Sequence, residues 1–367
     1  MTTAHHATLV PDIPSLDGLR ALSVLIVMVS HAGLGHVVPG GLGVTVFFFL
    51  SGYLITTLLR AEMARTGTVG IGAFYVRRFL RLGPPLFITL ALAYGLVAAG
   101  VHGGGLSVQG ALAQVFYLAN YYAIFWDPGQ TVPDGTGVLW SLAVEEHFYL
   151  IYPFVFLLLA RRLSARQLAA VLVAVCLAVL AWRMVLVAQP GVLEARTYYA
   201  TDTRIDSIAW GAVLALAFNP VRVPGEPVPA LPLPNSPDWR HLLALAAGLG
   251  LLLFTLVVRD PWMRETLRYT LQGVALMPVF YVAVRFAQHP LFRPLNWGWM
   301  RRLGVYSYAM YLIHHVVVLN LKHNMPWGDR LLPVLAVTLV VSVLYAAAIE
   351  RWVESRMRRL RARFRPA

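Results

Sequence analysis

The sequence predicts an all-α fold: a polytopic membrane helix bundle with about ten transmembrane helices and one short re-entrant or external element. Of the 367 residues, 58% are hydrophobic and 13% are charged, whereas soluble domains carry about 45–50% apolar and about 25% charged residues. The apolar residues are gathered in runs of roughly 17–22 residues, the length at which a helix crosses about 30 Å of hydrocarbon. Most basic residues stand between these runs.

Other classes of protein fit this composition poorly. The single cysteine, Cys176, excludes a disulfide-linked scaffold, and the aromatic content of 12% together with the long apolar runs excludes disorder. The net charge of +13 does not indicate a nucleic-acid partner, because the basic residues punctuate apolar segments instead of forming a basic surface. The first apolar run contains Arg20 and His31 and lacks a clear cleavage site, so we expect it to remain as a membrane helix.

Ten apolar runs are predicted to span, and the loop charges predict their orientation. An eleventh run, 111–126, is short and rich in Tyr and Asn. If it does not cross, every strongly basic connection falls on one side, which in membrane proteins is the cytoplasmic side. We therefore predict cytoplasmic termini and an external or re-entrant element at 102–137. The ten runs cover residues 16–35, 41–60, 83–101, 138–160, 168–188, 203–219, 241–258, 270–287, 303–320 and 331–350.

The predicted organisation has one membrane domain and two tails. A cytoplasmic N-terminal tail covers residues 1–15, the membrane domain covers 16–350, and a basic cytoplasmic C-terminal tail covers 351–367. The proline-rich stretch 220–237 is expected to form a partly extended cytoplasmic loop. The arginines of the C-terminal tail are expected to lie on anionic lipid headgroups.

The first predicted helix carries two ionisable residues on one face. Arg20 and His31 are eleven residues apart, which is about three full helical turns and roughly 16 Å along the axis. Ionisable groups inside spanning helices are costly and are therefore functional candidates. A snorkelling arginine and a histidine bonded to a neighbouring carbonyl are the alternatives.

The second helix and the connection after it hold further candidates. Ser51 and Gly52 precede Tyr53, and such small residues allow close helix contact or the approach of a ligand. Arg77 and Arg81 lie one helical turn apart, with Arg78 beside them, an arrangement suited to binding phosphate. Helix packing alone, and anchoring of the topology by positive charge, remain open as alternatives.

Later helices add carboxylate, aromatic and imidazole side chains. The fourth predicted helix opens with Trp140 and Ser141 and continues through Glu145 to Tyr149. Glu145 is expected at a depth similar to that of His31, although an interfacial aromatic belt with solvated carboxylates is the alternative. Asp206 lies near the start of the sixth helix. The ninth helix holds Tyr308, Tyr311, His314 and His315, for which a structural role also stays open, and these histidines show no metal-binding spacing.

These residues together resemble the acyltransferase type 3 family of integral membrane O-acyltransferases. The run from Leu16 to Arg20 followed by His31 resembles that family's first motif, and the stretches 43–53, 75–84 and 140–149 resemble later blocks in the same order. Asp206 with Gly211, and residues 307–314, match weaker blocks, so the resemblance covers about 15–350. One departure is Thr45, where many members have an aspartate. Some relatives also carry an esterase-like domain, which we expect this chain to lack.

The resemblance implies transfer of an acyl group, expected to be acetyl, from cytoplasmic acyl-CoA to a hydroxyl of a sugar-containing acceptor. A surface glycan, a glycolipid or a glycosylated metabolite would serve as acceptor, and acetyl-CoA or another acyl-CoA would be the co-substrate with no metal. The expected location is the bacterial inner membrane, with the lipid bilayer, acyl-CoA and the acceptor as partners and no nucleic acid. A polytopic transporter is the alternative, although no internal repeat supports it.

The expected roles follow from the chemistry of each side chain. His31 would act as the general base, with Glu145 holding its imidazole tautomer as the acid does in a serine triad. Arginines on the cytoplasmic side would hold the coenzyme phosphates: Arg20, Arg77, Arg78 and Arg81. Residues expected to line the substrate cavity are Ser51, Tyr53, Trp140, Ser141, Tyr149, Asp206, Tyr311 and His314.

Overall fold

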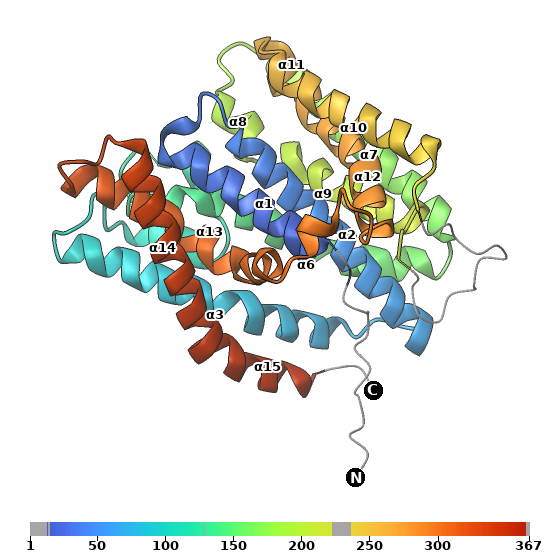
Figure 1. Cartoon of the computed structure of the whole chain (residues 1–367), viewed down its shortest axis with the longest axis horizontal. Coiled ribbons are helices and arrows are strands. Elements are labelled where there is room, and N and C mark those ends of the chain that lie inside the picture. The colour runs from blue at the N-terminus through green and yellow to red at the C-terminus, as the bar shows by residue number, and fades with distance from the viewer. Residues whose placement is uncertain (1–12, 14, 128, 222–235, 365–367) are drawn as a thin grey trace.

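A computed structural model describes residues 13, 15–127, 129–221 and 236–364, and within these ranges the chain is helical apart from loops and one isolated bridge between Gly104 and Pro133 (Figure 1). The predicted all-α bundle is therefore confirmed for the described residues. Most of the predicted N-terminal tail, most of the proline-rich loop and the last three residues of the C-terminal tail lie outside the described residues.

All ten predicted apolar runs form helices. Among the described residues, eight helical segments are long and apolar enough to cross a membrane. The other two predicted spans are α9, which has 17 residues, and α13, which carries Arg301 and Arg302 and several other polar side chains. The ten helices are α1 (Leu16–Val29), α2 (Gly40–Thr66), α3 (Ile71–Ala98), α6 (Leu139–Ala160), α7 (Ala165–Val187), α9 (Thr201–Ala217), α10 (Trp239–Val257), α12 (Leu267–Arg285), α13 (Gly298–Asn324) and α14 (Leu331–Ile349).

The stretch between α3 and α6 does not span. It holds two short helices, α4 (Val108–Val115) and α5 (Ala119–Phe125), which at 1.5 Å per residue are about 12 Å and about 10 Å long. The bridge between Gly104 and Pro133 brings the two ends of this stretch together. The structure thus agrees with the predicted re-entrant or external element.

Short elements mark the two ends of the bundle. We call the end where α1 finishes the α11 end, because α8 (Glu194–Tyr199) and α11 (Pro261–Glu265) lie there, toward the top of Figure 1. The opposite end, where α1 begins, is the α15 end. The remaining short elements are η1 (Ser30–Leu34), η2 (Thr136–Val138), η3 (Arg293–Asn296), η4 (Glu350–Glu354) and α15 (Ser355–Ala362).

Glycines allow the central helices to touch backbone to backbone. A Cβ atom added to Gly211 of α9 would lie 1.8 Å from the carbonyl oxygen of Phe49, and one on Gly52 of α2 would lie 1.9 Å from that of Ile208. The same holds for α1 and α13, where a Cβ on Gly304 would lie 1.9 Å from the carbonyl oxygen of Asp17. Small residues allow this close approach in membrane bundles, so Gly52 serves packing.

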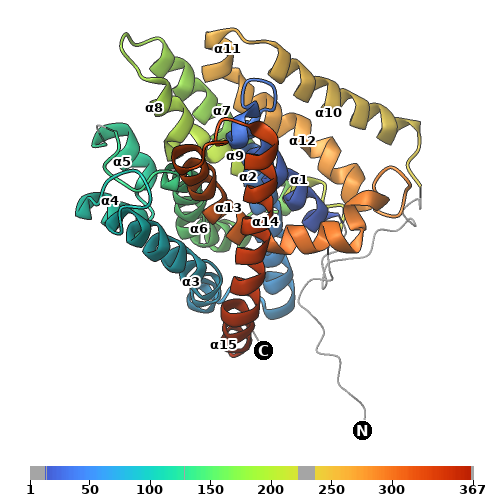
Figure 2. The ribbon, with the colours of Figure 1, turned by 60° about the vertical axis from the view of Figure 1, so that its left-hand side comes forward.

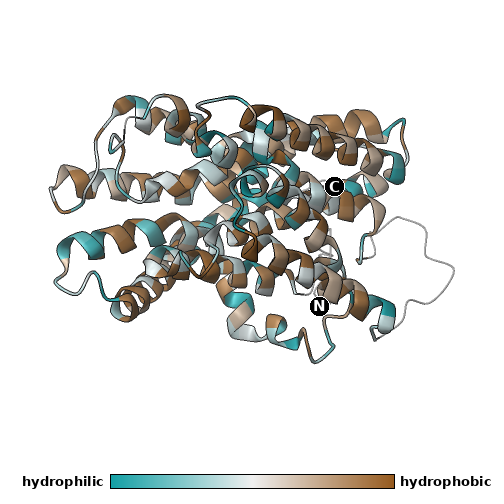
Figure 3. Cartoon of the chain, turned by 90° about the horizontal axis from the view of Figure 1, so that it is seen from above, coloured by the Kyte–Doolittle hydropathy of each residue, from teal (hydrophilic) through white to brown (hydrophobic). Residues whose placement is uncertain are grey.

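The outward faces of the peripheral helices are apolar. Leu177 on α7 and Leu243 and Leu253 on α10 are exposed, and Figure 2 shows α10 at the edge of the bundle. Hydrophobic residues run along the helices in Figure 3, while hydrophilic residues appear at several helix ends and in loops. Exposed apolar side chains are expected where a protein faces lipid instead of water.

Candidate active site

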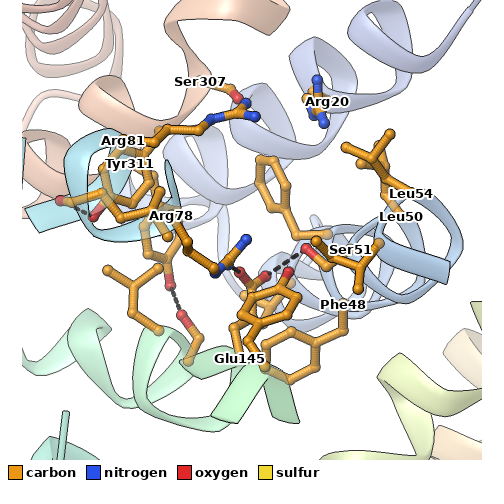
Figure 4. Close-up of a pocket in the computed structure, with 18 of the residues that line it drawn as sticks. Arg20, Phe48, Leu50, Ser51, Leu54, Arg78, Arg81, Glu145, Ser307 and Tyr311 are labelled. Carbon is orange, nitrogen blue, oxygen red and sulfur yellow. Dashed lines mark hydrogen bonds and ion pairs between the residues drawn. The ribbon is translucent and has the colours of Figure 1, made fainter. Parts of the chain in front are cut away.

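The first of two cavities lies toward the α15 end and is lined by three arginines. Arg20 of α1 and Arg78 and Arg81 of α3 surround it, and we call it the arginine cavity. Predicted residues that also line it are Ser51, Ser141, Glu145, Tyr149 and Tyr311. Figure 4 shows Arg78 reaching toward Glu145, which lies beside Ser51.

The arginines of this cavity differ in how far their charge is compensated. Arg20 forms an ion pair with Asp17 at 2.8 Å. Arg78 donates to Glu146 at 3.0 Å, lies 3.9 Å from Glu145, and is stacked 3.1 Å above the centre of the Tyr149 ring. Arg81 is exposed and forms no hydrogen bond or ion pair with the described residues. Its guanidinium group is therefore available to an anionic ligand.

The second cavity, the histidine cavity, lies toward the α11 end. His31 and His315 line it together with aromatic side chains from α6 and α8, namely Trp140, Tyr198 and Tyr199. His31 sits in η1, a single π-helical turn that continues α1 and contains Gly33 at a φ of 143°. Only glycine adopts such a φ without strain, and π turns are frequent at functional sites.

A chain of hydrogen bonds fixes the tautomer of His31. Nδ1 of His314 lies 2.7 Å from the carbonyl oxygen of Tyr311, and a carbonyl only accepts, so this nitrogen donates. Nε2 of a neutral His314 is then an acceptor, and Nδ1 of His31 donates to it at 2.9 Å. This leaves Nε2 of neutral His31 without a proton, the state that a general base requires.

Two side chains form part of the wall of both cavities. Val44 of α2 and Tyr311 of α13 line the arginine cavity and the histidine cavity alike. The Tyr311 hydroxyl lies 2.7 Å from the Ser141 hydroxyl and donates to the carbonyl oxygen of Val138 at 3.1 Å. The two cavities thus meet at Tyr311, with positive charge on one side and an imidazole base on the other.

Comparison with known proteins now identifies the family. A family model described as an acyltransferase domain, that of the type 3 acyltransferases, matches residues 13–349. This chain belongs to the acyltransferase type 3 family. No solved structure matches it.

Three bacterial relatives show which proteins this chain is similar to. It is 31% identical over 324 residues to the peptidoglycan O-acetyltransferase OatA of Listeria monocytogenes, covering 83% of this chain and 49% of the relative. It is 30% identical to the putative peptidoglycan O-acetyltransferase YrhL of Bacillus subtilis, and the match covers 97% of this chain and 56% of the relative. It is 28% identical to the O-acetyltransferase OatA of Staphylococcus aureus, and the match covers 95% of this chain and 57% of the relative. The chain spans about half the length of these curated relatives.

The predicted contact between His31 and Glu145 is wrong. Glu145 instead accepts a hydrogen bond from Ser51 at 3.1 Å and faces Arg78, while His31 is bonded to His314. The reason is depth: α6 begins at Leu139, so Glu145 lies about 9 Å along the helix from its start. His31 lies beyond the last residue of α1, in η1. Glu145 therefore belongs to the arginine cavity.

Four other predicted residues line neither cavity. One is His314, which is fully buried and bonded to His31. Arg77 forms an ion pair with Glu62 at 3.2 Å, so Arg78, its neighbour, takes the place beside Arg81. The buried hydroxyl of Tyr53 donates to Asn219 at 2.9 Å. Asp206 is fully buried and forms a bidentate ion pair with Arg183. Nη1 lies 2.9 Å from Oδ1 and Nη2 lies 2.8 Å from Oδ2. These contacts give Tyr53 and Asp206 structural roles.

The sequence analysis missed several contributors to the histidine cavity. His315 stacks on His31, with ring centres 4.2 Å apart, whereas the predicted cavity residues include only His314. Tyr198 and Tyr199 come from α8, which has six residues and follows a loop. A segment this short shows no periodicity, so only the aromatic pair itself was a signal.

The departure at Thr45 also has a structural consequence. Thr45 is buried, donates to the Gly41 carbonyl oxygen at 3.0 Å, and lies 3.3 Å from Nη2 of the fully buried Arg204. An aspartate at this position would place a carboxylate beside that arginine. With threonine, Arg204 has a neutral partner here, and its other hydrogen bond goes to the carbonyl oxygen of Tyr198.

Proposed function

We propose that this protein transfers an acetyl group from acetyl-CoA, bound in the arginine cavity, to a sugar hydroxyl of a glycan in the histidine cavity. The observation that supports this most is the pair of cavities that meet at Tyr311 and Val44. One offers cations to a phosphate-bearing donor, and the other offers a base to an acceptor. Membership in an acyltransferase family favours this function over the transporter alternative.

The donor side is supported by the three arginines. Coenzyme A carries several phosphate charges at one end and its thioester at the other, so a site for it needs cations at a distance from the reacting carbonyl. Arg20, Arg78 and Arg81 supply the cations. The thioester end would then extend past Tyr311 toward His31. Because Arg161, Arg162 and the basic α15 lie at this end, we place it in the cytoplasm, where positive loops collect.

The chemistry would proceed at Nε2 of His31. This nitrogen takes the proton of the acceptor hydroxyl while the hydroxyl oxygen attacks the thioester carbonyl. A carbon–oxygen bond forms, the carbon–sulfur bond breaks, and the proton passes from His31 to the departing thiolate. His314 holds His31 in the reactive tautomer throughout, because its Nε2 accepts from Nδ1 of His31.

The acceptor side is supported by the lining of the histidine cavity and by the relatives. Trp140, Tyr198 and Tyr199 present aromatic surface, against which the apolar face of a sugar ring can pack. The similar proteins are named for O-acetylation of peptidoglycan. We therefore propose a bacterial cell-surface glycan as the acceptor class, with the protein in the cytoplasmic membrane.

The decisive experiment measures free thiol released from acetyl-CoA by purified protein, with and without a glycan acceptor. We expect acceptor-dependent release in the parent and a loss of about 10²–10⁴-fold in His31→Gln, the usual contribution of a general base. Binding of acetyl-CoA should change little, because the arginine cavity is intact. His323→Gln, an exposed histidine on the same helix as His314, is the matched control.

Two outcomes would contradict the proposal. Thiol release that is independent of any acceptor would mean that the protein does not transfer the acyl group to a glycan. Normal turnover in a folded, monodisperse His31→Gln protein would mean that His31 is not the base.

A further inference from the structure

A groove beside α11 adjoins the histidine cavity and has no role in the function proposed above. We call it the α11 groove. It has a volume of about 750 Å³ and shares Ser30, Gly40, Gly41 and Tyr198 with the histidine cavity. It is open at the α11 end of the bundle, the end away from the arginine cavity.

The lining of the α11 groove is rich in positive charge. Arg259, Arg264 and Arg268 line it, and none of its described lining residues is a carboxylate. Arg259 donates to a backbone carbonyl, that of His36, at 3.2 Å. Arg268 donates to the Tyr269 hydroxyl at 2.8 Å, and its buried Nε has no hydrogen-bond partner among the described residues. Each guanidinium group offers five donors, so most of these donors remain available.

The carboxylates near these arginines lie outside the lining of the groove and offset part of its charge. Asp260 accepts from the backbone nitrogen of Met263 at 2.8 Å and so caps α11. Glu265 accepts from the Thr197 hydroxyl and lies near enough to act electrostatically on Arg268 and Arg264. Glu194, which is 67% exposed and lines the histidine cavity, forms an ion pair with Arg264 at 3.9 Å. Exposed pairs of this kind contribute little, so Arg264 stays available to a ligand.

A fourth arginine adds positive charge behind the groove. The fully buried Arg204 lies 3.8 Å from the centre of the Tyr269 ring, and Tyr269 lines the groove. Its hydrogen bonds go to the carbonyl of Tyr198 and the hydroxyl of Thr45, both neutral, and its Nε has no partner among the described residues. Asp206 offsets part of the cost of this buried charge electrostatically, and a bound anion nearby would offset more.

Resting on the proposed function, we propose that the acceptor is acidic and that the α11 groove binds its oxyanion, a carboxylate or a phosphate. Arginine recognises both groups with paired hydrogen bonds. The donor does not account for this site, because the arginines suited to coenzyme A lie in the arginine cavity at the other end. An anion held in the α11 groove positions the attached sugar over the shared residues and toward His31.

The test compares three acceptors in a neutral detergent that contains no anionic lipid. They are a neutral chitooligosaccharide, a glycan of the same length with free peptide carboxylates, and a sugar linked to a polyprenyl diphosphate. Arg268→Gln and Arg264→Gln should raise KM about tenfold or more for at least one acidic acceptor. They should leave KM for the neutral acceptor and for acetyl-CoA within about threefold. Arg330→Gln, an exposed arginine in the loop before α14, is the matched control.

The acidic acceptor that loses affinity identifies the oxyanion as carboxylate or phosphate. Equal losses for the neutral and acidic acceptors would overturn the proposal, since the arginines would then be structural. No loss for either acidic acceptor would overturn it as well.

A binding measurement separates this proposal from the catalytic one. The acidic glycan alone should raise the thermal unfolding temperature of the parent more than that of Arg268→Gln, whether or not acyl transfer occurs. Inactive protein that shows this difference would contradict the proposed function and support the groove. If phosphatidylglycerol reproduces the difference and the acidic glycans do not, the groove holds a lipid headgroup and the proposal fails.

Discussion

The arginine cavity and the histidine cavity share Tyr311 and Val44, yet their ionisable side chains are paired in opposite ways. In the arginine cavity, carboxylates face Arg20 and Arg78 and leave Arg81 exposed. In the histidine cavity, His31 is bonded to another imidazole, which is itself bonded to a backbone carbonyl. Binding the proposed acetyl-CoA donor would require cations that are not fully paired, whereas the proposed proton transfer would require a fixed tautomer of His31. The structure separates these two requirements along the length of α1.

The largest expected difference is in thiol labelling at the two ends of the bundle, because the proposed function requires the two cavities to face opposite compartments. In a Cys176→Ala background, Gln109→Cys and Asp329→Cys, at exposed positions of the α11 end, should react with an impermeant thiol reagent in intact cells. Arg162→Cys, exposed between α6 and α7, should react only after the cells are opened. The measurement is labelling of the purified protein. Labelling of Arg162→Cys in intact cells would mean that the orientation in the membrane is the opposite of the one proposed.

The next effect concerns the tautomer of His31. His314→Leu removes the acceptor for Nδ1 of His31 and should lower kcat by about 10–10³-fold, less than loss of the base itself. His314→Asn offers an amide oxygen to the same proton and should recover part of that activity. The two variants should bind acetyl-CoA like the parent. If Asn and Leu are equally impaired at equal protein stability, His314 does not act through the tautomer.

A smaller effect tests the donor site with a matched pair of arginines on one helix. Arg81→Gln should raise KM for acetyl-CoA by about tenfold, equivalent to about 1.4 kcal/mol of binding free energy, and leave the acceptor's KM unchanged. Arg77→Gln is the control, because Arg77 is paired with Glu62 outside the cavity. Steady-state kinetics at several salt concentrations should show the larger salt dependence in the parent. Equal effects of the two substitutions would mean that Arg81 has no specific role in binding the donor.

The smallest effect is expected at Glu145. Glu145→Gln should change kcat by no more than about threefold, because Glu145 contacts Ser51 and Arg78 and not His31. A small change in KM for acetyl-CoA is expected, since a carboxylate beside the donor phosphates is lost. Steady-state kinetics against both substrates make the comparison. A loss of kcat approaching that of His31→Gln would mean that Glu145 takes part in the catalytic step.

The bundle could be predicted from the sequence because its signals are local. The length of each apolar run indicates whether it can span the membrane, and the arginines of the loops indicate which side of the membrane each loop occupies. The pairing of His31 with His314 could not be predicted from the sequence, since it joins residues 283 positions apart. The choice between Arg77 and Arg78 depends on the rotation of α3 about its axis, as neighbouring residues point about 100° apart. The error at Glu145 did not come from a helix boundary, because the predicted run 138–160 and α6 (Leu139–Ala160) nearly coincide. The partners of Glu145, Ser51 and Arg78, depend on how α6 packs against α2 and α3, which an apolar run does not report.

The crossing of α2 and α9 limits how this protein can move. Where Gly52 and Gly211 meet the opposite backbone, there is no layer of side chains that could slide or re-pack as the two helices shift. Alternating-access machines depend on such shear between their halves. A bundle joined here keeps α2, and with it Val44 and Ser51, at constant positions. In the proposed transfer, the route between the cavities would open by side-chain rotation at Tyr311 and Val44, and the helices themselves would not need to move apart.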